Sequence, residues 1–94
     1  MLKIQLSKRA AKFLSSLPTK QAKQILSAID ETAKNPSSVI SEKLKGYKDC
    51  ERVTIGEYRF IFRIQQNVLI LNVLIIGKRN DDEVYKIFKR IANT

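Results

Sequence analysis

The chain has no histidine and a single cysteine, Cys50, among its 94 residues. The usual zinc ligand sets combine several His and Cys side chains, so no metal site is expected and no cofactor is indicated. One cysteine also excludes an internal disulfide, and Cys50 is expected to be a small, partly buried residue where a strand begins. Long apolar runs are missing too. The longest, residues 68–76, is interrupted by Asn72 and is far shorter than the roughly 20 residues of a membrane span.

Acidic residues are scarce. Lys and Arg number 18 against 9 Asp and Glu, which gives a formal net charge of +9. This excess favours a polyanionic partner, with nucleic acid the first to consider, although an acidic protein would answer the same charge. Lys3 and Gln5 interrupt any signal-peptide pattern, so we expect a cytoplasmic protein without a membrane association. The length suits one domain that spans residues 1–94.

The first 35 residues predict a strand followed by two helices. Residues 2–6 alternate apolar and polar side chains as a short strand does. Ser7 can cap the first helix, and Pro18 is expected to end it. A second helix is expected from about Thr19 until Asn35-Pro36, because the residue before a proline avoids the helical region. The apolar stripes of the two helices are Ala10, Phe13, Leu14 and Leu17, and Ala22, Ile25, Leu26, Ile29 and Ala33.

Residues 36–48 show no period and contain Gly46, so we expect a surface connection. Its lysines, Lys43, Lys45 and Lys48, are candidate RNA contacts, because connecting loops often carry binding residues.

Two strands, 51–55 and 58–64, are predicted to form a hairpin around Gly56-Glu57, since glycine suits the first central position of a two-residue turn. This turn pairs Thr54 with Arg59. The aromatic side chains then share one face of the sheet, and the other face carries Arg52, Thr54, Arg59 and Arg63.

A third strand at 68–76 is expected after a turn centred on Gln66-Asn67, which pairs Leu74 with Arg59. Leu69, Leu71, Val73 and Ile75 are then predicted to face the aromatic set. Asn72 joins the arginines in this register. The alternative register places Asn72 among the aromatic rings without a partner, at a cost of about 1–3 kcal/mol.

A last helix is expected from Asn80 or Asp81, with acids in its first turn and basic residues in its last, as the helix dipole favours. The predicted fold class is therefore α+β. It comprises an antiparallel sheet of about four strands, two N-terminal helices on its aromatic face and a short C-terminal helix. The opposite face is predicted to be open and rich in arginine. Like charges on neighbouring strands are unfavourable unless an anion neutralises them.

Such a face could cleave RNA by attack of a 2′-hydroxyl on the adjacent phosphate. Arg59 and Arg79 are the leading pair for stabilising charge on the phosphorane, since planar guanidinium groups grip phosphate well. Tyr85 could stack on a base or take part in proton transfer. Without histidine, the candidate bases are Glu51, Glu57, lysines and tyrosines.

The segments KLKGYKDCERVTIGEYRFIFRI, IIGKRNDDEVY and KIFKRI resemble the RelE family of toxin–antitoxin ribonucleases, within the RelE/ParE superfamily, over essentially the whole chain. The resemblance implies a microbial-ribonuclease-like fold and a metal-independent mRNA endonuclease. It also implies action in the A site of the 30S ribosomal subunit and silencing by a cognate RelB-like antitoxin.

The same resemblance implies that Arg59 of the YR element and Arg79 of GKR contact the scissile phosphate, while Tyr85 of EVY orients the 2′-hydroxyl or stacks on mRNA. Arg52 matches the first basic position of the preceding strand. At the second basic position of that strand the chain departs from the family pattern, because Thr54 stands where the family has a lysine assigned as the general base. The base is then another group, with Lys43, Lys45 and Tyr85 as candidates, or cleavage is weaker. Arg63 and Lys78 complete the expected RNA contacts. A ParE-like gyrase inhibitor and a degenerate toxin that only binds antitoxin or RNA remain alternatives.

Overall fold

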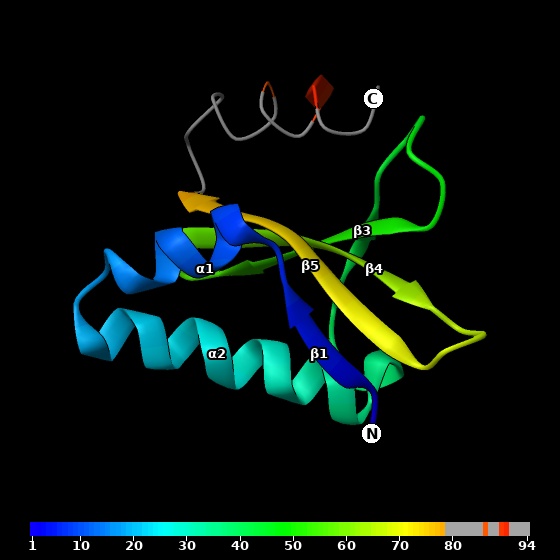
Figure 1. The fold of residues 1–94 in the computed structure, drawn as a ribbon, viewed down its shortest axis with the longest axis horizontal. Helices are drawn as coiled ribbons and strands as arrows, with labels where there is room; N and C mark the ends of the chain where they lie inside the picture. The colour runs from blue at the N-terminus through cyan, green and yellow to red at the C-terminus, as the bar shows by residue number, and fades with distance from the viewer. Residues whose placement is uncertain (79–85, 87–88, 91–94) are drawn as a thin grey trace.

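The computed structural model describes residues 1–78, 86, 89 and 90. Strand β1 (Lys3–Leu6) is followed by helices α1 (Lys8–Ser15) and α2 (Thr19–Lys34). After a 3-10 turn, η1 (Pro36–Ser38), come β2 (Glu42–Lys43), β3 (Cys50–Ile55), β4 (Tyr58–Gln65) and β5 (Ile70–Lys78). Both helices lie on one side of the sheet (Figure 1), which confirms the predicted α+β class. Of the predicted C-terminal helix, Lys86, Lys89 and Arg90 are helical and exposed. The rest of that helix lies outside the described residues.

The sheet differs from the prediction in strand number and direction. It has five strands in the order β1-β5-β4-β3-β2, and β1 runs parallel to β5. Alternation in residues 2–6 predicts a strand but carries no information about the direction of its partner. The added strand, β2, comes from the stretch expected to be an irregular connection. It is too short to show a period, and it exists because Glu42 and Lys43 pair with Arg52 and Glu51 of β3.

The helix ends follow the sequence signals. Ser7 is the N-cap of α1, and its Oγ accepts a hydrogen bond from the Ala10 N–H at 3.0 Å. Asn35 follows the last residue of α2 and precedes Pro36. One apolar position was predicted wrongly: the Leu26 side chain is 44% exposed, whereas Thr32 is fully buried. Thr32 tolerates burial because its hydroxyl donates to the Ala28 carbonyl at 2.8 Å.

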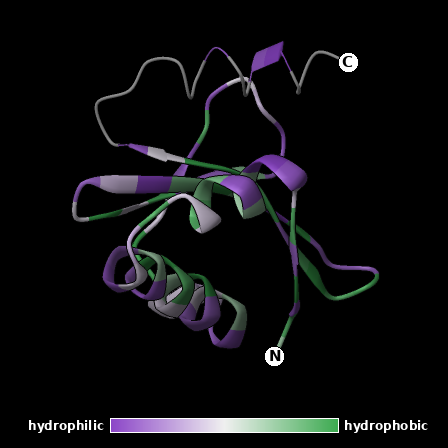
Figure 2. Ribbon diagram, turned by 60° about the vertical axis from the view of Figure 1, so that its left-hand side comes forward, coloured by the Kyte–Doolittle hydropathy of each residue, from purple (hydrophilic) through white to green (hydrophobic). Residues whose placement is uncertain are grey.

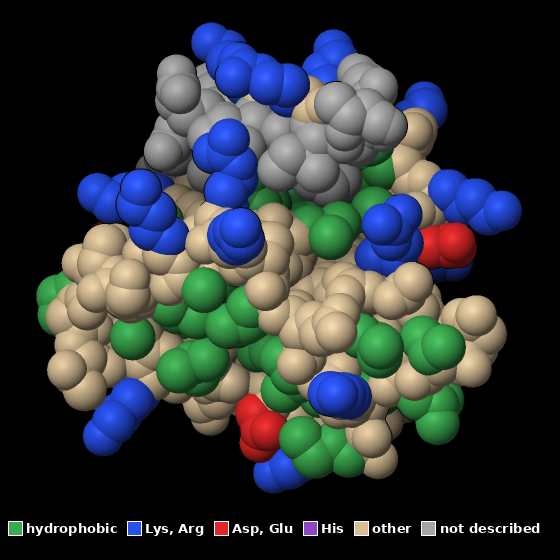
Figure 3. Space-filling view, viewed as in Figure 1, with side chains coloured by type: hydrophobic (Ala, Val, Ile, Leu, Met, Phe, Trp, Pro, Cys, Tyr) green, Lys and Arg blue, Asp and Glu red, His purple; other side chains and the backbone are tan. Residues whose placement is uncertain are grey.

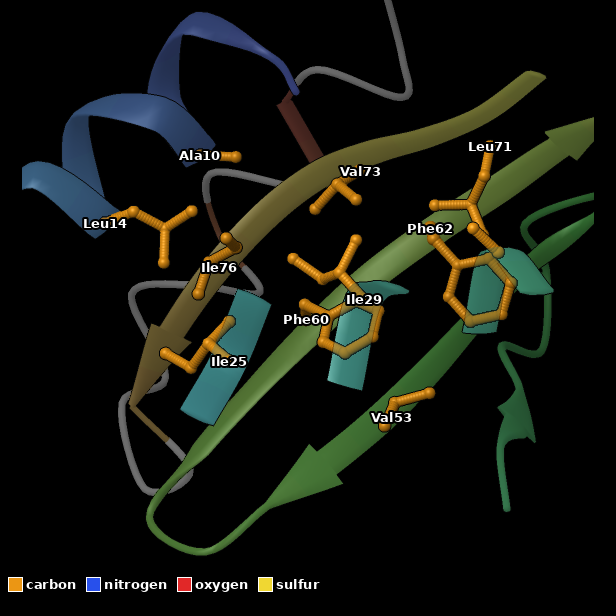
Figure 4. Packing of buried hydrophobic residues seen from close by; sticks show 11 residues of the cluster. Ala10, Leu14, Ile25, Ile29, Val53, Phe60, Phe62, Leu71, Val73 and Ile76 are labelled. Atoms are coloured by element: carbon orange, nitrogen blue, oxygen red, sulfur yellow. The ribbon is translucent and has the colours of Figure 1, made fainter. Parts of the chain in front are cut away.

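The main core lies between the helices and the sheet. Figure 2 shows hydrophobic residues on the side of α2 that faces the sheet and hydrophilic residues on its outer side. Ile25 and Ile29 of α2 belong to the same buried cluster as Phe60 of β4 (Figure 4). The buried members of the cluster are Ala10, Leu14, Ile25, Ile29, Ala33, Val53, Phe60, Phe62, Leu71, Val73 and Ile76. Among the described residues, no helix is long and apolar enough to cross a membrane.

The hairpin between β3 and β4 has the predicted register, with Thr54 opposite Arg59 and Gly56 at a φ of 56°. The register between β4 and β5 was predicted wrongly. Gln65 pairs with Ile70, because the turn occupies residues 66–69 and is longer than expected. A β-bulge opposite Ile61 and Phe62 then adds one further residue, so Arg59 lies opposite Gly77 instead of Leu74.

The bulge reverses the alternation of side chains along β5. Leu71 and Val73 face the helices as predicted, but the residue beyond the bulge that does so is Ile76, not Ile75. Ser7 fixes this irregularity. Its hydroxyl donates to the Leu74 carbonyl at 2.7 Å, and its N–H donates to the Val73 carbonyl at 3.0 Å.

We predict that Ser7→Ala lowers the free energy of unfolding by about 1–2 kcal/mol, because it removes the α1 cap and the hydrogen bond at the bulge. Urea denaturation followed by circular dichroism measures the change. Ser27→Ala, on the exposed side of α2, is the control and should change stability by less than about 0.5 kcal/mol. Equal effects of the two substitutions would contradict the role given to Ser7.

Phe60 is 1% exposed and is the largest fully buried side chain among the described residues. We predict that Phe60→Ala destabilises the fold by about 3–5 kcal/mol, because it deletes a ring from a packed core. The same denaturation experiment measures it, and a loss below about 1 kcal/mol would show that the core does not depend on this ring.

Candidate nucleic-acid interface

The sheet face opposite the helices carries the predicted arginines. Cross-strand pairing places Arg52 beside Ile61, Arg59 beside Thr54, and Arg63 beside Cys50. Because paired residues point to the same side of a sheet, the three arginines share one face. Arg52 and Arg59 are half-buried, while Arg63 is exposed. The predicted grouping of these residues is therefore confirmed.

This face was predicted to be open, and that expectation was wrong for its middle. Cys50, Ile61 and Ile75 form a second buried cluster, in which Ile61 is 0% exposed. Leu44 and Tyr47, from the chain before β3, pack against this cluster together with Leu74. The bulge is the physical reason, because it turns both Leu74 and Ile75 toward the arginine face.

The two cross-strand neighbours of Arg59 form a row with it across three strands, and both are small. Thr54 of β3 lies on one side of it and Gly77 of β5 on the other. The Nε atom of the Arg59 guanidinium is buried. The next pair along the two strands is Tyr58 and Lys78, where β5 ends with Lys78 exposed. A guanidinium with small cross-strand neighbours suits contact with a phosphate.

Arg52 has a carboxylate partner that the sequence pattern did not reveal. Its Nη2 lies 2.6 Å from Oε2 of Glu42, the residue opposite it on β2. The Arg52 side chain is 22% exposed and that of Glu42 is 66% exposed. An anion that approached Arg52 would compete with Glu42 for the guanidinium. No periodic signal predicted β2, so this pair could not be foreseen.

The predicted lysines are spread along the sheet edge. Lys43 lies on β2 opposite Glu51. Lys45 and Lys48 are exposed in the turn region before β3, in which Gly46 has a φ of 85°. A pocket of about 830 Å³ brings Lys43 and Arg63 together with Tyr47, Asp49 and the amide side chains of residues 65–67. Glu51 also lines the pocket, so two cations are balanced by two carboxylates.

Glu51, a candidate base, is separated from Arg59 by the sheet. It pairs with Phe62, which belongs to the main core, so it points to the helix side. Its Oε1 accepts a hydrogen bond from the Ser41 hydroxyl at 2.7 Å. Glu57, in the hairpin turn, is exposed.

Arg79 and Tyr85, which were predicted to act on the phosphate and the 2′-hydroxyl, lie outside the described residues. Within the described part of the chain, no group of three or more His, Cys, Asp or Glu residues is placed so that it could hold a metal ion.

Cys50 is 5% exposed. Burial raises the pKa of its thiol, because a thiolate loses solvation in the packed sheet, and the positive charge of Arg63 opposes this shift in pKa.

Comparisons with known proteins identify the family and the fold. A family model described as the ParE toxin of type II toxin–antitoxin system, parDE, matches residues 4–83. No curated protein sequence is significantly similar to the chain. The isolated E. coli RelE toxin superposes with a TM-score of 0.74 at 24% identity, covering 97% of this chain and 99% of the toxin.

Two archaeal complexes are also similar. The RelE–RelB complex of Pyrococcus horikoshii has a TM-score of 0.69 at 24% identity, with 84% of this chain and 96% of the other covered. The RelB–RelE antitoxin–toxin complex of Methanococcus jannaschii has a TM-score of 0.66 at 22% identity, with 88% and 96% covered. At these identities the likeness establishes the fold.

We predict that Cys50 reacts with a thiol reagent more slowly in the native protein than in urea, with a pH profile displaced upward by its raised pKa. Arg63→Ala should displace the profile further upward, because it removes a positive charge that favours the thiolate. Lys34→Ala, on α2, is the matched control. Identical profiles in folded and unfolded protein would contradict burial of the thiol.

The raised pKa of Cys50 also makes the stability of the fold depend on pH. As the pH rises, the Cys50 thiol ionises at a lower pH in the unfolded chain than in the folded protein. Its contribution to the free energy of unfolding is therefore complete below the ordinary thiol pKa of about 8.5 and is lost as the pH rises toward the folded pKa. Cys50→Ala should remove that part of the alkaline loss of stability.

Proposed function

Since the chain belongs to the ParE toxin family of type II toxin–antitoxin systems, within the RelE/ParE superfamily, we propose that it is a toxin that cleaves mRNA in the ribosomal A site and so inhibits translation. Its RelE-like YR, GKR and EVY elements favour the nuclease branch of the superfamily. The observation that carries the proposal is the row of Thr54, Arg59 and Gly77, which leaves a half-buried guanidinium between two small neighbours.

The proposed reaction is attack of the 2′-oxygen on the adjacent phosphorus, with breakage of the bond to the 5′-oxygen. The 2′-hydroxyl proton passes to a base, and the 5′-oxygen gains a proton as it leaves. Arg59 and Arg79 stabilise negative charge on the phosphorane, because fixed donors act without reorganisation as charge develops. Tyr85 orients the 2′-hydroxyl or stacks on the base. No cofactor takes part in this scheme.

The remaining cations are proposed to bind the RNA. Arg52 contributes a phosphate contact once an anion competes with Glu42 for its guanidinium. Arg63 extends the positive charge from Arg59 along the sheet, and Lys78 adds charge at the end of β5, on the side of its partner Tyr58. Lys43, Lys45 and Lys48 are proposed as further contacts at the sheet edge. The general base is Lys45 or Tyr85, since Thr54 cannot accept a proton at neutral pH, and Glu51 and its cross-strand partner Lys43 point to the helix side of the sheet.

We propose a cognate RelB-like antitoxin as the inhibitory partner, because the archaeal structures that this fold resembles are complexes of a RelE toxin with RelB. An acidic antitoxin would also complement a chain with a net charge of +9. Gyrase inhibition is the second candidate function, and the match to the ParE toxin family favours it.

We predict that wild-type protein cuts ribosome-bound mRNA at the A-site codon and that Arg59→Ala reduces the cleavage rate by a factor of about 100 or more, the loss usual for a charge-stabilising donor. Primer extension on purified ribosomes with a programmed mRNA measures it. Lys23→Ala, an exposed cation of α2, is the control and should cut at the wild-type rate. Ribosome-free RNA tests the requirement for ribosomes.

Arg79→Ala belongs in the same assay and should lose cleavage like Arg59→Ala. Thr54→Lys places an amine directly beside Arg59, and faster cleavage by this variant would identify the missing base. Intact mRNA with folded, antitoxin-free wild type would overturn the nuclease proposal. Accumulation of cleaved, gyrase-bound DNA would instead establish the second candidate, and neither activity with retained antitoxin binding would mark a degenerate toxin.

A further inference from the structure

The outer side of α1 carries three cations. Lys8, Arg9 and Lys12 are exposed, whereas Ala10 and Leu14 on the inner side are buried in the main core. We name the three cations the α1 basic face. None of them belongs to the residues predicted to act at the scissile phosphate. They are also separate from the sheet face that carries Arg59.

No acidic group of the described residues neutralises this face. The described ion pairs are Lys34 with Asp30 and Arg52 with Glu42, neither of which involves α1. The helix has no acid in its first turn, where Lys8 and Arg9 oppose the helix dipole. Lys8 and Lys12 are also four residues apart, a spacing at which like charges repel. Each of these arrangements disfavours the isolated helix, and a bound polyanion would relieve both.

The α1 basic face lies at the end of the molecule where β5 stops. Phe13 of α1 touches Tyr58 of β4 edge to face, with ring centroids 6.1 Å apart. Tyr58 is paired with Lys78 and is next to Arg59 in the chain. On the face drawn in Figure 3, Lys and Arg side chains are more numerous in the upper half of the view than in the lower half. Tyr58 packs against the main core, so Lys78 points to the helix side, as α1 does. A nucleic-acid strand at Arg59 would have to pass around the end of β5 to reach Lys78 and α1.

The chemistry of the face favours phosphate over a protein segment. Its other exposed positions are small, namely Ala11, Ser15 and Ser16. A stable protein interface needs an apolar centre, and the large exposed apolar side chains of the described residues lie elsewhere, at Met1, Leu26, Ile40, Val68 and Leu69. The long Lys and Arg side chains are about 6 Å apart along the axis between positions 8 and 12, which allows contact with neighbouring phosphates.

We propose that the α1 basic face binds the phosphate backbone of RNA outside the cleavage site and holds the toxin on the ribosome. This assignment rests on the proposed function for its setting, but it concerns binding and not the chemical step. The partner is the sugar–phosphate backbone, read through charge without base specificity.

The test compares two triple variants that lower the net charge equally, from +9 to +6 by removal of three cations. Lys8→Gln/Arg9→Gln/Lys12→Gln removes the α1 basic face, and Lys3→Gln/Lys23→Gln/Lys34→Gln is the control on β1 and α2. Affinity for 70S ribosomes programmed with mRNA is measured over a range of KCl concentrations. Glutamine is a good helix former, and circular dichroism with thermal melting verifies each fold.

We expect the α1 variant to bind ribosomes at least ten times more weakly, while the control loses less than threefold. The slope of log K against log salt should fall by about 2 for the α1 variant, at roughly 0.7 per lost phosphate contact. Lys12→Gln alone, which leaves the first turn intact, should give about a third of that change. At saturating protein, the α1 variant should cut at the wild-type rate, whereas Arg59→Ala should bind but not cut.

Equal losses in the two triple variants would overturn the assignment and leave only a net-charge effect. Normal ribosome binding by the α1 variant, with weakened binding confined to the cognate antitoxin, would overturn it in favour of a protein partner. If wild type binds RNA through the α1 basic face but never cleaves it, the proposed function fails and this inference stands.

Discussion

The anchoring of the β-bulge by Ser7 is the constraint on which the arrangement of the sheet depends. One side chain caps α1 and also holds the Leu74 carbonyl, so the start of the helix and the irregularity of β5 are fixed together. A bulge adds one residue and changes which side chains face each side of a strand. Beyond Leu74, the alternation places Ile76 in the main core and Gly77 opposite Arg59. The composition of both sheet faces follows from this local geometry.

The arginine face combines a small apolar cluster with charged groups. Ile61 and Ile75 are buried at its centre, and the chain before β3 packs over them through Leu44 and Tyr47. This packing restricts the Cys50 thiol and supports the strand that carries Arg59 and Arg63. Stiff support suits the charge-stabilising role proposed for Arg59, because a donor that is already in place needs no reorganisation when charge develops.

Charge is distributed unevenly between the elements. Among the described residues, Glu42 neutralises Arg52 and Asp30 neutralises Lys34. Helix α1, in contrast, carries cations at positions where the helix dipole opposes them. Local stability would favour acids in that first turn. A surface that departs from the local optimum in this way is expected where a partner supplies the missing charge. The two proposals thus place catalysis and ribosome binding on different parts of one basic molecule.

The sequence by itself determined the local elements and the superfamily. Ser7, Asn35-Pro36 and Gly56-Glu57 act on their own neighbours, so the helix ends and the first hairpin could be predicted from them, as could the grouping of Arg52, Arg59 and Arg63 on one face. The tertiary structure decided the pairing of β5, the existence of β2 and its Glu42–Arg52 ion pair, and the parallel direction of β1. Each of these depends on hydrogen bonds between segments distant in the chain. A turn without glycine and a bulge held by a residue 67 positions away leave no periodic signal in the sequence.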